Sequence, residues 1–200
     1  KKFIFALIAI PLVFMNYVGT KQALAAATET TIPYVCTATV PILNLPLTLN
    51  MEVTVAADLP ESVKPNSTFS ILDSYTEVYF GKDMVPILNI AVNPLKGTVE
   101  RFNIHLENAT SADGSEVINV AEGGLAIPET HFNENDDSVS FRVPADGSIE
   151  IDLVAGDGGN VVLTAGEIVT VLNGSLGGIP VTIPSTCVPG IYDYNQEALI

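Results

Sequence analysis

Cysteine and histidine, which supply most thiol nucleophiles, general bases and zinc ligands, occur only twice each in this chain of 200 residues: Cys36, Cys187, His105 and His131. Neither cysteine has a second cysteine two residues away, as a redox motif would require. In an exported protein an even number of cysteines favours a disulfide, and two cysteines allow only one pairing. We therefore predict a bridge between Cys36 and Cys187, with a free or catalytic thiol as the alternative.

The two histidines do not indicate a catalytic site. His105 occupies a polar position of a predicted strand and His131 lies in an acidic segment, so both are predicted to be surface residues. No Gly-x-Ser-x-Gly motif supplies a serine nucleophile, and a zinc site lacks ligands once the cysteines are paired. We predict that the protein is not an enzyme and assign no catalytic residue. The alternative is a secreted hydrolase that uses a pair of its 23 acidic residues.

Oxygen-bearing side chains are concentrated in one loop, where Asn133, Asn135, Asp136 and Asp137 are the candidate calcium ligands. Calcium prefers six to eight oxygen ligands from a flexible loop. The spacing does not match an EF-hand, and Asp and Asn are also common turn formers. The same holds for the turn at 157–160. We therefore assign no metal or cofactor and keep calcium as an alternative.

The first 25 residues have the pattern of a cleavable export signal. Lys1 and Lys2 precede an apolar run over residues 3–14, and Ala23 and Ala25 form an Ala-x-Ala site. A membrane anchor would need about 20 apolar residues, and this run is shorter. We predict cleavage after residue 25 and a location outside the cell.

The charge of the chain excludes one class of partner. The sequence contains 8 basic and 23 acidic residues, and removal of residues 1–25 takes away three lysines. Five basic residues then face 23 acidic ones, a net charge of −18. Nucleic acids bind clustered Lys and Arg, so we predict no nucleic-acid partner. We also predict no membrane contact after cleavage, and an extracellular protein or glycan is the expected kind of partner.

The rest of the sequence alternates between apolar and polar residues with a period of two. Odd positions are apolar from 47 to 57, and the same alternation returns in 101–107 and 149–153. This pattern is typical of antiparallel strands that are wetted on one face. Further strands are predicted at 34–40, 68–72, 85–92, 116–120, 139–143, 161–164, 168–172 and 179–183.

Turn signals and ambiguous segments complete this interpretation. Asp146-Gly147 predicts that 139–143 and 149–153 form a hairpin, and Asn173-Gly174 is a further turn signal. Residues 73–84 fit a short helix as well as a strand, and 129–137 reads as an exposed loop. We expect one β domain over residues 26–193 and a loose C-terminal end over 194–200.

Short motifs spread over most of the chain are Tyr34-Val35-Cys36, residues 57–60, residues 143–147, Ala165-Gly166-Glu167 and Thr186-Cys187. Together they resemble an uncharacterised family of exported domains from Gram-positive bacteria. The resemblance implies an antiparallel, immunoglobulin-like β-sandwich with its terminal cysteines bridged, in proteins at or beyond the cell wall. Another Greek-key sandwich or a jelly roll is the alternative fold. The family implies no activity and transfers no functional residue.

The sequence thus predicts a secreted, non-enzymatic, all-β domain that serves as an extracellular or cell-surface structural or adhesion-type module. One alternative is a calcium-assisted domain that binds carbohydrate or protein. The other is the secreted hydrolase with a carboxylate pair. No ligand-binding residue is assigned.

Overall fold

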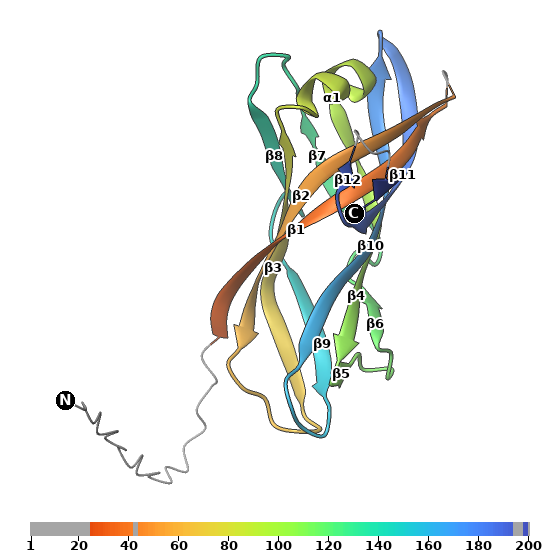
Figure 1. Cartoon of the computed structure of the whole chain (residues 1–200). Coiled ribbons are helices and arrows are strands. Elements are labelled where there is room, and N and C mark those ends of the chain that lie inside the picture. The colour runs from red at the N-terminus through yellow and green to blue at the C-terminus, as the bar shows by residue number, and fades with distance from the viewer. Residues whose placement is uncertain (1–24, 42–43, 194–197, 200) are drawn as a thin grey trace, which may run out of the picture.

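The computed structural model describes residues 25–41, 44–193 and 198–199 (Figure 1). The predicted export signal lies outside these residues except for Ala25, and so does most of the predicted loose C-terminal end. The described residues form an all-β, antiparallel structure, as the alternation predicts. None of their helices has the length and apolarity that a membrane crossing requires.

The long strands are β1 (Ala25–Val40), β2 (Leu45–Pro60), β3 (Thr68–Gly81), β4 (Leu95–Glu107), β10 (Val162–Leu176) and β11 (Ile179–Pro189). The shorter ones are β5 (Ala109–Thr110), β6 (Val117–Asn119), β7 (Leu125–Thr130), β8 (Ser138–Val143), β9 (Ile149–Ala155), β12 (Tyr192–Asp193) and β13 (Ala198–Leu199). A single helix, α1 (Val85–Val92), follows β3 in the described part of the chain.

One sheet contains all the long strands and bends until its two ends approach each other. Its order is β5-β9-β3-β2-β1-β11-β10-β4-β6, with β7 also paired to β4 and β8 also paired to β3. Because β5 follows β4 in the chain and pairs with β9, the ends of this order meet at β4 and β5. Strands β7 and β8 contact each other in the same way. The result is a nearly closed, barrel-like sheet (Figure 1). Its inner face carries the apolar core of the protein.

The predicted alternation places the apolar residues of β2 on this inner face. Leu49, Met51 and Val53 are buried, whereas Glu52 between them is exposed. Strand β2 pairs with β1 in unbroken register from Ala25↔Pro60 to Val40↔Leu45. These two strands therefore form one long wall of the interior.

A β-bulge at Asp73 changes which residues of β3 face inward. Ile71 pairs with Ile151 of β9, but the next pair is Ser74 with Ile149, so β3 contains one extra residue. Asp73 has a left-handed backbone (φ 49°) and is exposed. A bulge of this kind reverses the phase of the side chains. Ile71 and Ser74, three residues apart, are consequently both buried.

The prediction of a strand over 85–92 is wrong, because these residues form α1. A mostly apolar segment of eight residues, interrupted here only by Asn89, cannot be assigned by periodicity alone. Pro86 stands in the first turn, where proline favours a helix start. The buried side of α1 covers one end of the sheet (Figure 1). There Gly174 allows close approach, since a Cβ at this residue would lie 2.7 Å from the Cα of Val92.

The predicted hairpin between 139–143 and 149–153 is also wrong. Strand β8 pairs with Thr76–Gly81 of β3, and β9 pairs with the earlier part of the same strand. The two segments thus lie along one long partner, and Asp146-Gly147 joins them without a reversal of pairing. Similarly, 161–164 and 168–172 belong to one strand, β10, which also contains Asn173-Gly174, so this pair makes no turn.

The segment 129–137 is mostly exposed, as predicted, but one residue anchors it. Phe132 is 1% exposed and packs edge-on against Phe80, with 6.2 Å between ring centroids. The Asn93 side chain donates to the Phe132 carbonyl oxygen (2.8 Å) and accepts from its N–H (3.1 Å). The acidic loop therefore extends from a fixed point on the core.

The predicted disulfide is present between Cys36 and Cys187. These residues are direct partners in the pairing of β1 with β11. The bridge therefore joins two adjacent strands that are 151 residues apart in sequence.

Candidate functional site

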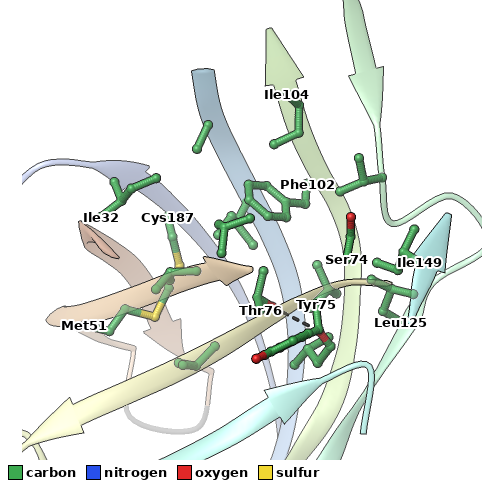
Figure 2. A pocket seen from close by; sticks show the side chains of 18 of the residues that line it. Ile32, Met51, Ser74, Tyr75, Thr76, Phe102, Ile104, Leu125, Ile149 and Cys187 are labelled. Atoms are coloured by element: carbon green, nitrogen blue, oxygen red, sulfur yellow. Dashed lines mark hydrogen bonds between the residues drawn. The ribbon is translucent and has the colours of Figure 1, made fainter. Parts of the chain in front are cut away.

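A cavity of about 400 Å³ lies inside the curved sheet (Figure 2). Its wall consists mainly of Val, Leu, Ile and Phe side chains from the inner faces of the long strands. No charged residue of the described chain lines it. Pockets that bind small molecules have volumes of about 300–1,000 Å³ and mostly apolar walls with a few polar groups. The size and chemistry of this cavity match that class.

The cavity is covered at one end and open at its side. Leu88 of α1, which is 2% exposed, lines the covered end. At the side, β1 pairs with β11 only from Tyr34 onward and β10 pairs with β11 only from Ile168 onward. Before these points no described strand lies between β1 and β10. Exposed lining residues stand on both margins, namely Thr28 and Thr30 on β1 and Val162 on β10.

Ser74 is the one described residue whose buried side-chain oxygen has no hydrogen-bond partner. The residue is 7% exposed and belongs to the cavity wall. Figure 2 shows its side chain projecting from β3 into the cavity, toward the side that carries Phe102 and Ile104. Buried hydroxyl groups in folded proteins are nearly always hydrogen-bonded, so this oxygen is available to a bound molecule.

Several other polar atoms of the wall have neighbours in the fold. The Thr76 hydroxyl donates to the carbonyl oxygen of Val143 at 3.2 Å. The Ser185 oxygen lies 3.8 Å from Sγ of Cys187. Sδ of Met51 lies 3.6 Å from Sγ of Cys36, which we interpret as packing because a disulfide sulfur carries no hydrogen to donate. Ser74 is thus distinct among the polar groups of the wall.

Tyr34 connects β1 with β10 near the point where the pairing of β1 with β11 begins. Its hydroxyl donates to the carbonyl oxygen of Gly166 at 2.8 Å, and the residue is fully buried. Burial raises the pKa of the Tyr34 phenol from 10.0 to about 12. The phenol is therefore neutral at physiological pH and acts as a hydrogen-bond donor.

The predicted calcium ligands come only partly together. Asp136 accepts hydrogen bonds at 3.1 Å from both the backbone N–H and the side-chain amide of Asn133, which closes a local turn. Asp137 instead forms an exposed ion pair with Lys82, with 3.8 Å between Nζ and Oδ1. Asn135 is exposed. Within the described residues no group of three or more His, Cys, Asp or Glu side chains is placed to hold a metal ion.

The two histidines lie outside the cavity. His105 is exposed on the outer face of β4, and His131 is exposed beside Glu129, with 3.4 Å between Nε2 and Oε1. Asp113 lies in another exposed loop, where the Ser111 hydroxyl and the Ser115 N–H lower the pKa of its carboxyl group. Neither histidine belongs to the wall around Ser74.

Sequence reasoning did not find the cavity or Ser74. The alternation of 47–57 correctly identifies inward residues, but it predicts only that they are buried and not that space remains between them. The phase change at Asp73 could not be read from composition. The comparisons with family models, curated proteins and solved structures found no significant match.

Proposed function

We propose that this protein is an exported binding domain that holds an apolar molecule inside its curved β-sheet. The cavity of about 400 Å³ with an uncharged, mostly aliphatic wall is the observation that carries this proposal. In the described part of the chain no strand lies between the first half of β1 and the start of β10, which offers a route of entry from the side. The role is one of binding and needs no catalytic residue.

The energetic cost of an unfilled interior supports a bound molecule. At the cost measured for engineered cavities, a fully enclosed empty space of 400 Å³ would destabilise the fold by about 10 kcal/mol, which is an upper limit here because this cavity is open at its side. That value is comparable with the whole stability of a typical domain. Water relieves such a cost poorly, because each buried water requires two to four polar partners. An apolar ligand would replace the missing contacts.

The disulfide supports the predicted location of the protein outside the cell. Disulfides persist outside the cytoplasm, so the Cys36–Cys187 bridge supports export. The antiparallel pairing is compatible with the finer assignment to an immunoglobulin-like sandwich, but it is equally compatible with a barrel, so that assignment stays a prediction. A cell-surface adhesion-type role, calcium-assisted binding and carboxylate hydrolysis stay predictions. No contact in the described residues favours any of the three.

Binding of a neutral, polarity-sensitive dye such as Nile red would test the proposal. We expect enhanced fluorescence and saturable binding to the wild-type protein. Ala57→Phe places a ring in the cavity and should weaken binding by about tenfold or more. Ala27→Phe, on the exposed face of neighbouring β1, is the matched control and should change the dissociation constant by less than about twofold.

The two variants must first be shown to fold, which a cooperative melting curve for each would establish. Absence of saturable dye binding by the wild type would overturn the proposal. Equal binding by Ala57→Phe and Ala27→Phe would do the same, because the dye would then lie outside the cavity.

A further inference from the structure

Among the described residues, the cavity wall contains one buried side-chain hydroxyl that has no hydrogen-bond partner. Ser74 is more than nine-tenths buried, and its hydroxyl oxygen has no partner among the described residues. A buried hydroxyl that finds a partner is more favourable than one left unpaired. A ligand with one polar atom at this depth would therefore be preferred over a pure hydrocarbon.

The wall also restricts the charge of the ligand. Since no charged side chain of the described residues lines the cavity, an ionised head group buried there would find no counter-ion. Burial of an unpaired charge is strongly unfavourable. The acidic balance of the chain, with 23 acidic against 8 basic residues, adds long-range repulsion for anions. The polar group next to Ser74 must therefore be neutral.

The position of Ser74 and the extent of the cavity indicate the form of the ligand. Ser74 lies next to the bulge of β3, beside Ile149 of β9 (Figure 2). The cavity reaches from Leu88 of α1 to the side opening at Thr28 and Val162. Aliphatic side chains dominate the wall over this length. A flexible hydrocarbon chain can follow such a space more readily than a rigid polycyclic molecule.

Resting on the proposed function, we propose that the natural ligand is a long-chain aliphatic compound with one uncharged hydrogen-bonding group, such as an alcohol, ester or amide, which the Ser74 hydroxyl binds. The chain occupies the apolar part of the cavity. Ser74 is a specificity-determining residue and not a catalytic one.

Four probe compounds of similar length test this inference by dye displacement: 1-decanol, undecane, decanoate at pH 8 and decyltrimethylammonium. We expect wild-type protein to bind 1-decanol about fivefold to tenfold more tightly than undecane. This factor corresponds to the net free energy of one hydrogen bond, about 1 kcal/mol. Both ionic compounds should bind more weakly than 1-decanol. Ser74→Ala should lose this preference and bind undecane at least as tightly as 1-decanol, because the buried alcohol hydroxyl then has no partner.

Thr76→Val is the matched control for Ser74→Ala. Thr76 is a hydroxyl residue of the same strand that also lines the cavity, but its hydroxyl is already bound to Val143. This variant should keep the preference for 1-decanol over undecane. The affinities for 1-decanol and undecane are compared within each variant. A general loss of stability would lower both affinities and would not remove the preference for 1-decanol.

Equal binding of 1-decanol and undecane by the wild type would overturn this inference and leave the proposed function standing. The same holds if Ser74→Ala keeps the preference, or if decanoate binds most tightly. If the dye binds but none of the four compounds displaces it, this inference fails and the proposed function stands. If the dye itself does not bind, both fail.

Discussion

The hydroxyl of Tyr34 donates a hydrogen bond to the carbonyl oxygen of Gly166, a residue 132 positions later in the chain. Tyr34 is also the first residue of β1 that pairs with β11, opposite Pro189, and the residues of β1 that precede it have no partner in β11. Before this point β1 and β10 have no strand between them in the described structure. The hydrogen bond thus links the two strands at the margin of the opening and helps to fix its size.

The raised pKa of Tyr34 predicts a loss of stability at alkaline pH. The folded state holds the phenol proton more tightly than the unfolded state, with pKa values of about 12 and 10.0. The stabilisation is complete below pH 10 and disappears as the pH rises from 10 toward 12. After allowance for solvent screening we expect a contribution of about 2 kcal/mol. Urea unfolding between pH 9 and pH 11.5 would measure it.

Two variants distinguish the contribution of Tyr34 to the alkaline loss of stability from that of the other ionising groups. Tyr34→Phe should be less stable by about 1 kcal/mol at pH 9, because the hydrogen bond to Gly166 is lost. It should also show a smaller loss between pH 10 and 11.5 than the wild type. Tyr79→Phe, at a residue that is 39% exposed, should retain the wild-type pH dependence. Parallel curves for Tyr34→Phe and the wild type would contradict this prediction.

Removal of the disulfide should destabilise the domain, because the unfolded chain then gains conformational entropy. In the chain-entropy model a crosslink between residues 151 apart contributes about 5 kcal/mol, and measured losses are about 2–5 kcal/mol. We expect this loss for the double variant Cys36→Ala/Cys187→Ala in urea unfolding. Reduced wild-type protein should behave in the same way. Two free thiols in the mass spectrum of the exported wild-type protein would contradict the pairing.

Close approach of strands β4 and β10 requires a glycine at position 97. A Cβ there would lie 2.2 Å from the carbonyl oxygen of Val171, so the paired backbones must shift. We expect Gly97→Ala to destabilise the protein by about 3 kcal/mol, at the upper end of typical overpacking. Gly81→Ala is the control, because its Cβ would meet only the Tyr79 ring at 3.7 Å. A loss in Gly81→Ala as large as that in Gly97→Ala would show that the contact is not the cause.

The sequence predicts most strands, because the antiparallel sheet has one polar face and one apolar face. The alternation in 101–107 is an example: Phe102, Ile104 and Leu106 are buried, whereas Arg101 and His105 are exposed. The disulfide also follows from the sequence, because two cysteines allow one pairing. Helix α1 does not follow, since its eight residues are mostly apolar and Met84 at the N-cap is not a residue type that caps a helix with its side chain. Pro86 is the signal that could have identified it.

The cavity could not be predicted, because it depends on long-range pairing. The hairpin signal at Asp146-Gly147 is local, but β3 is long enough to pair with both β8 and β9. The position of Ser74 depends on the extra residue at Asp73. A strict period of two from Ile71 would place Ser74 on the outer face. Tertiary contacts therefore decide both features.

The bulge itself can be tested at Asp73. Its left-handed backbone is unfavourable for a β-branched residue, at a cost of about 1–2 kcal/mol, whereas Asn adopts it readily. Asp73→Val should therefore be less stable than the wild type by about that amount. Asp73→Asn keeps an oxygen that can accept from the Ser148 hydroxyl and should lie within about 0.5 kcal/mol of the wild type. Urea unfolding of the two variants would decide, and equal stabilities would mean that the backbone at Asp73 is not constrained.

The length of the cavity predicts how affinity depends on the length of the ligand chain. Each methylene transferred from water into an apolar site contributes about 0.8 kcal/mol, which is about a fourfold change in affinity. In a series of linear alcohols from hexanol upward, the dissociation constant should fall by this factor per carbon until the interior is full. It should then become constant, because further carbons remain in the opening near Thr28 and Val162. In Ala57→Phe the constant value should be reached with a shorter alcohol, since the added ring occupies part of the same space. Isothermal titration calorimetry of both proteins would measure these limits, and a dissociation constant that does not change with chain length would show that the alcohols bind elsewhere.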